Sequence, residues 1–215
     1  MTRSVIFDCD GVLVDTEEIA NRVLAGLLSE AGLETTFDDC MRDYRGRAMA
    51  SVLETATDRL GAPLPFDLAD RYYTEVKDIF ARELEPVPGV IAALDQISLP
   101  SCVASSGPHH KMEVTLRRTG LWDRFEGRIF SASEVDAGKP SPDLFLHAAR
   151  QMGFDPATTA VVEDSLPGVQ AARAAGMRAL AFARHTDAEV LADAGGEPFT
   201  DMAELPGLLG APAGA

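Results

Sequence analysis

Two aspartates near the N-terminus, Asp8 and Asp10, have a spacing that suits acid chemistry. They follow an apolar run at residues 4–7, which predicts a buried strand, and they stand just before Gly11. Unpaired carboxylates are costly to bury, but a cation beside them makes such a pair useful. One carboxylate can then ligate a metal or attack an electrophile, while the other moves a proton. Taken alone, the segment from Asp8 to Gly11 is also compatible with a short acidic turn.

Further polar side chains follow two later strands and lie on one loop of the expected sheet. The apolar runs at residues 101–104 and 159–162 both end in polar groups, and residues 138–143 form a proline-stiffened loop with one lysine. The side chains in question are Ser105, Ser106, Lys139, Glu163 and Asp164. Because ligands bind at the carboxyl edge of an open parallel sheet, we expect these groups to gather there with the two aspartates.

Together these segments resemble the four motifs of the haloacid dehalogenase superfamily phosphatases, in their order along the chain. The resemblance is to the β-phosphoglucomutase-like branch, in which a helical cap follows the first motif, and it spans nearly the whole sequence. Residues 102–112 and 144–149 are similar to the bacterial 6-phosphogluconate phosphatase-like members of that branch. The combination of motifs is specific, although no single motif is.

The resemblance implies a division of roles among the acids. Asp8 would be the nucleophile that forms an aspartyl-phosphate, and Asp10 would be the general acid and base. Mg²⁺ would be held by Asp8, the main-chain carbonyl of Asp10 and Asp164, because this ion prefers oxygen ligands. Glu163 would ligate the metal weakly or orient its ligands, with a structural salt bridge as the alternative.

The same resemblance implies a cradle for the phosphoryl oxygens. Lys139 would supply a fixed positive charge, while Ser105 and the N–H group of Ser106 would donate hydrogen bonds. The main-chain N–H groups of Gly11 and Val12 would add to them. For Ser105, capping of the following helix is a compatible alternative, since both roles use the helix N-terminus.

Substrate contacts are expected in the cap and beside the serine motif. Arg45, Gly46 and Arg47 occupy the region where this branch often carries a glycine-containing substrate loop, with Gly46 and Arg47 as the contacts. Arginine suits a carboxylate or a second phosphate, and an exposed surface arginine is the alternative. His109 and His110 lie at a helix start near the serine motif, either as a solvated pair or as a substrate contact.

The sequence therefore predicts a Mg²⁺-dependent phosphatase of small phosphorylated metabolites. Its substrates would be sugar or sugar-acid phosphates, with 6-phosphogluconate as one candidate. A phosphosugar mutase of the β-phosphoglucomutase type is the alternative, but Pro108 and His109 stand where that mutase has a lysine and an asparagine, which favours hydrolysis. A haloacid dehalogenase would not be expected to keep Asp10 or the late acidic pair, and a non-catalytic phosphometabolite sensor would usually lack the nucleophile or the lysine.

The segment after the first motif has only helical patterns. Residues 16–31 carry apolar side chains at helical spacing behind Thr16, which is the expected N-cap, and Gly32 stops the run. Further helices are expected at residues 38–44, 48–60 and 65–84. We therefore expect an inserted α-helical cap at residues 16–85.

Strands and helices alternate through the rest of the chain. Besides the strands already named, strands are expected at residues 127–130 and 178–182, and helices at 90–96, 108–119, 142–152, 167–175 and 187–194. This alternation is typical of an α/β protein with helices on both faces of a parallel sheet. We expect a doubly wound parallel sheet, a Rossmann-like catalytic core made of residues 1–15 and 86–215.

Composition limits the partners of the chain. Among 215 residues there are 19 Lys and Arg against 34 Asp and Glu, a net charge of −15. This charge disfavours nucleic acids and anionic membranes, so a phosphorylated substrate requires local positive charge. The three cysteines show no CxxC spacing, and no apolar stretch approaches the ~20 residues of a membrane span. We expect a cytoplasmic protein without a signal peptide, either a monomer or a weak homodimer.

Overall fold

The computed structural model describes residues 1–44 and 49–210. The chain divides into two compact units, a core unit of Met1–Val14 with Glu85–Ala215 and a helical unit of Asp15–Leu84. Both boundaries fall one residue before those expected from the sequence. Within the described residues, no helix is both long and apolar enough to cross a membrane.

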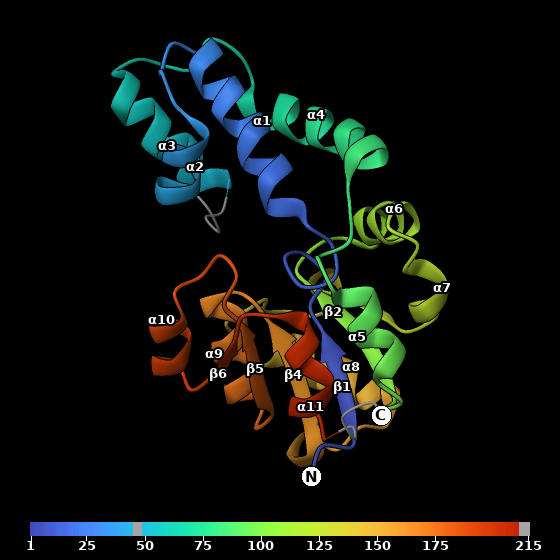
Figure 1. Ribbon diagram of the computed structural model, residues 1–215. Coiled ribbons are helices and arrows are strands. Elements are labelled where there is room, and N and C mark those ends of the chain that lie inside the picture. Colours follow the sequence, from blue (N-terminus) through green and yellow to red (C-terminus); the bar gives the residue numbers. More distant parts are fainter. Residues whose placement is uncertain (45–48, 211–215) are drawn as a thin grey trace. The chain divides into compact units, whose positions relative to one another are not determined.

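A six-stranded sheet forms the centre of the core unit (Figure 1). Its strands are β1 (Ser4–Phe7), β2 (Ser101–Ser105), β3 (Ile129–Ser131), β4 (Thr159–Glu163), β5 (Arg178–Phe182) and β6 (Glu197–Phe199). They lie in the order β3-β2-β1-β4-β5-β6, and all neighbouring pairs are parallel. The expected α/β fold with a doubly wound parallel sheet is confirmed.

Helices cover the sheet because successive strand side chains point to opposite faces. Ile6 and Val161 belong to one cluster with buried residues of α8 and α9, whereas Phe7 packs edge-on against Phe125 of α7 with ring centroids 5.9 Å apart. The helices of this unit are α5 (Val90–Gln96), α6 (His109–Arg118), α7 (Trp122–Phe125), α8 (Asp143–Met152), α9 (Leu166–Ala174), α10 (Ala188–Asp193) and α11 (Leu205–Leu208). Three short 3₁₀ turns complete the described core, at Ala132–Glu134, Pro156–Thr158 and Met202–Glu204.

The helical unit contains only helices in its described residues, as its sequence pattern predicts. They are α1 (Thr16–Glu30), α2 (Phe37–Asp43), α3 (Met49–Leu60) and α4 (Leu68–Glu83). The prediction of Thr16 as the N-cap of α1 is wrong, because Asp15 is the N-cap and Thr16 is the first helical residue, with 3% of its surface exposed. Gly32 follows the helix with φ +96°, a conformation that glycine adopts without strain.

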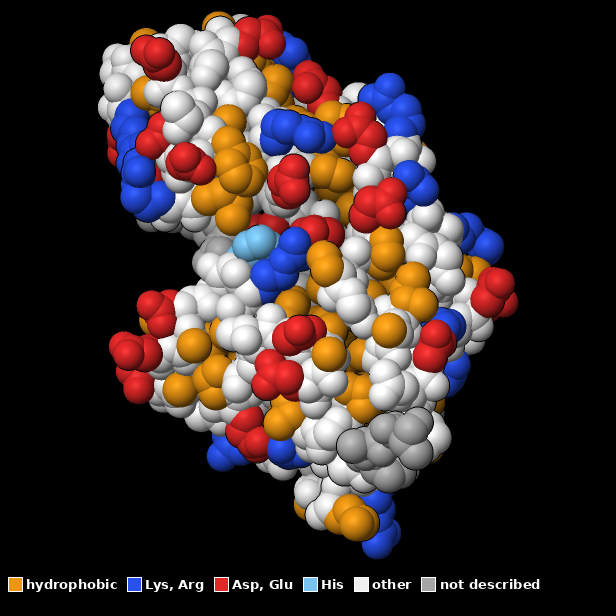
Figure 2. All heavy atoms as spheres, viewed as in Figure 1, with side chains coloured by type: hydrophobic (Ala, Val, Ile, Leu, Met, Phe, Trp, Pro, Cys, Tyr) orange, Lys and Arg blue, Asp and Glu red, His pale blue; other side chains and the backbone are white. Residues whose placement is uncertain are grey.

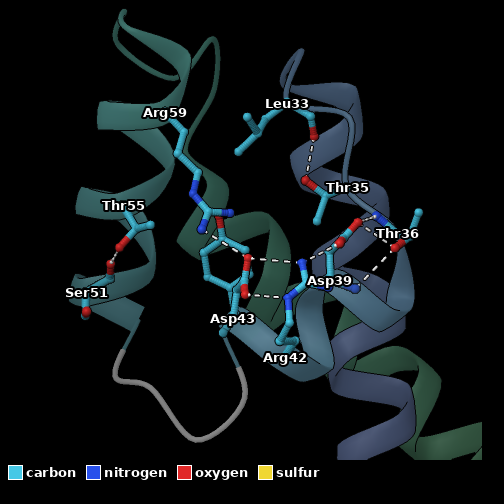
Figure 3. Close-up of polar contacts among 10 residues, drawn as sticks. Leu33, Thr35, Thr36, Asp39, Arg42, Asp43, Ser51, Thr55 and Arg59 are labelled. Atoms are coloured by element: carbon cyan, nitrogen blue, oxygen red, sulfur yellow. Dashed lines mark hydrogen bonds and ion pairs between the residues drawn. The ribbon is translucent and has the colours of Figure 1, made fainter.

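A polar network joins α2 to α3 (Figure 3). The Thr36 hydroxyl accepts a hydrogen bond from Asp39 N–H at 3.1 Å, which caps α2 and together with the Asp39 carboxylate forms a capping box. Arg42 pairs with Asp39 at 2.6 Å, and Arg59 of α3 pairs with Asp43 of α2 at 3.0 Å. Hydrogen bonds from Thr36 and Arg42 lower the pKa of Asp39 well below its usual range.

Three short core elements, α7, α11 and β6, were not predicted, and α11 like α7 spans only four residues. Helix α7 has only four residues, too few to show a helical period, and β6 contains Pro198, which cannot donate a ladder hydrogen bond. On the face in Figure 2, basic side chains are interspersed with acidic ones.

Candidate active site

The carboxyl ends of three neighbouring strands lie together at one edge of the sheet. Phe7, the last residue of β1, pairs with Val103 of β2 and with Val162 of β4. Asp8 follows directly, and its N–H donates to the Val162 carbonyl at 2.9 Å. Because the chain continues from β1 to β2 on one side and reaches β4 on the other, this edge is a topological switch point, where open α/β sheets bind ligands.

Lys139 lies between two buried carboxylates at this edge. Its ammonium group donates to Asp8 Oδ1 at 2.5 Å and to Glu163 Oε1 at 2.6 Å. The side chains of Lys139, Asp8 and Glu163 are only 6%, 9% and 1% exposed. Phe145 of α8 adds its ring face, 5.0 Å from the Lys139 nitrogen. The structure thus brings together the predicted nucleophile, the predicted lysine and one acid of the late pair.

Burial and the charge of the ion-pair partner shift the pKa values of Asp8 and Lys139 in opposite directions. Burial raises the pKa of Asp8 to about 7, because the attraction of Lys139 does not fully offset desolvation and the nearby Glu163 and Asp10 carboxylates. Burial lowers the pKa of Lys139, but the charges of Asp8 and Glu163 outweigh it and hold that pKa above its ordinary value. A cation placed beside Asp8 would act against the effect of burial, lower the pKa of Asp8 and favour its ionised form.

Both oxygens of the Glu163 carboxylate have hydrogen-bond partners. Its Oε2 accepts hydrogen bonds from the N–H and hydroxyl of Ser165, both at 2.8 Å, and Ser165 is the N-cap of α9. A Cβ at Gly168 would lie 1.8 Å from Glu163 Oε1, so only glycine permits this approach. Since both Glu163 oxygens already have partners, the geometry favours its salt-bridge role over direct metal contact.

The Asp164 carboxylate lies against a tight loop at Gly11, which follows Asp10 in the chain. The loop is closed by a hydrogen bond of 2.9 Å from the Gly11 N–H to the Val14 carbonyl, and Gly11 has φ +76°. A Cβ at Gly11 would lie 2.3 Å from Asp164 Oδ2, which places the Asp164 carboxylate against this main chain. The Gly11 N–H is thus engaged within the loop in this structure, so the expectation that it donates to a phosphoryl oxygen is not supported.

The serine motif forms a second, well-fixed loop. Ser105 is 1% exposed and its hydroxyl accepts from the Gly107 N–H at 3.1 Å, while Ser106 is exposed. Ser131, at the end of β3, donates from its hydroxyl to the Gly107 carbonyl at 2.8 Å. Ser105 does not cap α6, whose N-cap is Pro108. The Ser105 hydroxyl accepts its hydrogen bond from Gly107, which precedes the helix.

Sequence reasoning missed two residues around this loop, Lys111 and Glu134. Lys111, in the first turn of α6, donates to Asp10 Oδ2 at 2.8 Å. Glu134 accepts from Ser131 N–H at 2.6 Å and pairs with His109 at 2.8 Å and with His147 at 3.0 Å. The only sequence signal for Lys111 is that helical side chains lean toward the helix N-terminus, where the serine motif lies.

The remaining predicted substrate contacts have different outcomes. His109 is paired with Glu134, and His110 is exposed at the start of α6. Arg45, Gly46 and Arg47 lie outside the described residues. Their predicted contact with the substrate therefore stays a prediction.

The donor atoms at this edge suit a hard divalent cation. Within residues 1–44 and 49–210, no three His, Cys, Asp or Glu side chains form a ready metal site. The set of metal ligands that the sequence resemblance implies needs only two carboxylates, those of Asp8 and Asp164. The main-chain carbonyl of Asp10 is the third oxygen ligand. Asp164 lies against the loop that carries Asp10, and the donors are all oxygens, as Mg²⁺ prefers. The residues present therefore fit such an ion.

The chain matches the haloacid dehalogenase-like hydrolases over residues 2–176. It belongs to this family. The family match confirms two predictions from the sequence, the resemblance to haloacid dehalogenase-like proteins and the assignment as a hydrolytic enzyme. This haloacid dehalogenase-like hydrolase is similar to 6-phosphogluconate phosphatase of Escherichia coli, with 30% identity over 206 residues, 95% of this chain and 93% of that protein.

Two crystal structures extend the comparison. A conserved haloacid dehalogenase-like protein from Agrobacterium tumefaciens has a TM-score of 0.90 and 36% identity, with 100% of both chains covered. A haloacid dehalogenase family hydrolase from Deinococcus radiodurans, with bound phosphate and sodium, has a TM-score of 0.83 and 29% identity, covering 97% of this chain and 95% of that one.

The raised pKa of Asp8 gives this hydrolase a testable pH dependence. Without a divalent cation, folded Asp8 keeps its proton up to about pH 7, whereas its ordinary pKa is 3.8. Between these values the folded state binds more protons, so the stability contributed by this group is full at the acid end and is lost as the pH rises. Urea unfolding of wild type and Asp8→Asn, with chelator present, measures the effect. The wild type should gain stability relative to Asp8→Asn as the pH falls; a pH-independent difference would contradict the assignment.

Proposed function

We propose that this hydrolase is a Mg²⁺-dependent phosphatase of small phosphorylated metabolites that works through an aspartyl-phosphate on Asp8. The observation that carries the proposal is the Asp8 carboxylate held by buried Lys139 at the carboxyl end of the central strand. Similarity to an Escherichia coli phosphatase, and to a hydrolase solved with bound phosphate, supports the same chemistry.

In the first step, Asp8 attacks the phosphorus of the substrate. A bond forms between an Asp8 oxygen and phosphorus as the bond from phosphorus to the leaving oxygen breaks. Asp10 gives its proton to that leaving oxygen, which departs as an alcohol. Lys139 offsets the negative charge shared by Asp8 and the phosphoryl group, a repulsion that otherwise opposes attack by one anion on another.

In the second step, water removes the phosphoryl group from Asp8. Asp10 now takes a proton from the water as the water oxygen bonds to phosphorus and the Asp8–phosphorus bond breaks. Inorganic phosphate leaves and Asp8 returns as a carboxylate. One aspartate therefore serves both steps, first as an acid and then as a base.

Phosphoryl oxygens would be held by the serine motif and the Asp10 loop. The Ser105 hydroxyl, the Ser106 N–H and the Val12 N–H are the proposed donors, with Lys139 as the cation. When bound by Asp8, Asp164 and the Asp10 carbonyl, Mg²⁺ would polarise the phosphate and reduce its repulsion with the nucleophile. Glu163 acts by positioning Lys139, because its own oxygens are taken by Lys139 and Ser165.

Hydrolysis is favoured over phosphosugar isomerisation. The positions that hold a lysine and an asparagine in the mutase are Pro108 and His109, the N-cap and first residue of α6. Proline offers no side-chain donor, and His109 is paired with Glu134. A second phosphate would therefore lack two of the groups that hold it in the mutase.

Phosphate release from a panel of phosphorylated metabolites tests the proposed function. Wild type should release phosphate with Mg²⁺ and lose activity on exhaustive chelation, and isomerised sugar phosphate should not accumulate. Asp8→Asn should abolish turnover, because an amide does not accept the phosphoryl group in this way. Asp193→Asn, an exposed aspartate at the end of α10, is the matched control and should behave as wild type. Full activity in Asp8→Asn would show that the nucleophile lies elsewhere.

The substrate class proposed is sugar or sugar-acid phosphates, and Arg47 tests the sugar-acid part. The sequence resemblance puts Arg47 in a substrate loop, where a guanidinium would pair with a carboxylate remote from the phosphate. Arg47→Ala should raise KM for an acidic sugar phosphate roughly tenfold more than for a neutral one, since a charged hydrogen bond is worth about 1.5–3 kcal/mol. Equal changes for both substrates would make Arg47 a surface residue and leave the hydrolase assignment intact.

A further inference from the structure

Lys111 makes an ion pair with the predicted general acid and base. Its ammonium group lies 2.8 Å from Asp10 Oδ2, and the two side chains are 34% and 25% exposed. The residues are far apart in the sequence and meet because β1 and β2 are neighbours in the sheet, with Asp10 just beyond β1 and α6 following β2. Lys139 instead pairs with Asp8 and Glu163. The predicted nucleophile and the predicted proton-transfer group therefore each pair with a different lysine.

Gly107 forms the surface over which Lys111 reaches Asp10. A Cβ at Gly107 would lie 3.4 Å from Lys111 Cδ, 3.5 Å from Ser105 Oγ and 3.7 Å from Asp10 Oδ2. The Gly107 main chain is held on both sides, by its N–H to the Ser105 hydroxyl at 3.1 Å and by its carbonyl from Ser131 at 2.8 Å. The lysine stem therefore crosses a fixed loop, and its ammonium group has a defined position.

The two oxygens of the Asp10 carboxylate have different surroundings. Oδ2 accepts the hydrogen bond from Lys111. Oδ1 is buried and has no hydrogen-bond partner within the part of the chain that the structure describes. A buried carboxylate oxygen without a partner is costly, which is consistent with a position that a reacting group occupies during turnover.

We propose that Lys111 is a positioning residue for hydrolysis: by holding Oδ2 it fixes the Asp10 carboxyl group so that Oδ1 transfers the proton. This inference rests on the proposed function. In the first step the proton leaves Oδ1 for the leaving oxygen, and the charge that appears on Asp10 is balanced by Lys111. In the second step Oδ1 regains a proton from the attacking water, so Asp10 and Lys111 end the cycle unchanged.

The dependence on the leaving group separates this role from a general structural one. An alkyl phosphate needs its leaving oxygen protonated, whereas p-nitrophenyl phosphate releases a stable anion and needs little help. General acid–base help is worth about 10²–10⁴-fold, so Lys111→Met should lower kcat/KM for a sugar phosphate roughly tenfold or more. The value for p-nitrophenyl phosphate should change little, because kcat/KM reports only the steps through departure of the leaving group.

A double-mutant cycle tests whether Lys111 acts through Asp10. In an Asp10→Asn background, Lys111→Met should cause no further loss of kcat/KM for the sugar phosphate. Lys111→Arg should restore much of the wild-type rate, since it keeps a charged donor. Lys77→Met removes the same charge from an exposed site on α4 and should match wild type. If Lys111→Met does not fold, Lys111→Gln gives the same comparison.

The outcomes are distinct. Equal losses for the two phosphates, or a loss that persists in Asp10→Asn, would make Lys111 a phosphate-binding group and overturn the positioning role. An active wild type with unchanged Lys111→Met kinetics would overturn it as well. A wild type that releases no phosphate from any substrate would instead remove the proposed function, and this inference with it.

Discussion

Lys139 is a buried ammonium group whose charge is balanced by two carboxylates that come from adjacent strands. Removing one partner of a buried ion pair leaves an uncompensated charge, so the positions of Asp8, Glu163 and Lys139 are mutually dependent. The parallel register of β1 and β4 sets the separation of the carboxylates, and the loop before α8 brings in the lysine. The central part of the sheet is therefore also the framework of the site.

Close approach of main chain to carboxylate completes that framework. Gly168 allows the first turn of α9 to lie against Glu163, and Gly11 allows the Asp10 loop to lie against Asp164. A side chain at Gly168 would displace Glu163, on which the charge balance of Lys139 depends, and a side chain at Gly11 would displace Asp164. The serine motif is fixed in a similar way, since Ser131 and Ser105 hold Gly107 from opposite sides and leave a defined path for Lys111.

The sequence was sufficient to predict those elements and contacts that depend on local residue patterns. Apolar runs ending in polar groups predicted β1, β2 and β4 and the gathering of Asp8, Lys139 and Glu163 at one edge. Contacts that depend on how a helix is rotated were not predictable, and the Lys111–Asp10 pair is the main example. Short elements such as α7 lack enough residues to show a period. Asp15 and Thr16 are both residue types that occur at N-caps, and the structure shows that the helix begins after Asp15.

A trapped phosphoryl group tests the central claim most directly. Asp10→Asn with p-nitrophenyl phosphate should complete the first step, which needs little acid, and stall before the second, which needs a base. The reaction is quenched with acid, and the peptides are analysed by mass spectrometry. The account predicts one phosphoryl group on Asp8, with none trapped when Asp8→Asn is added to the same variant. Phosphorylation of a different residue, or turnover that never modifies Asp8, would contradict it.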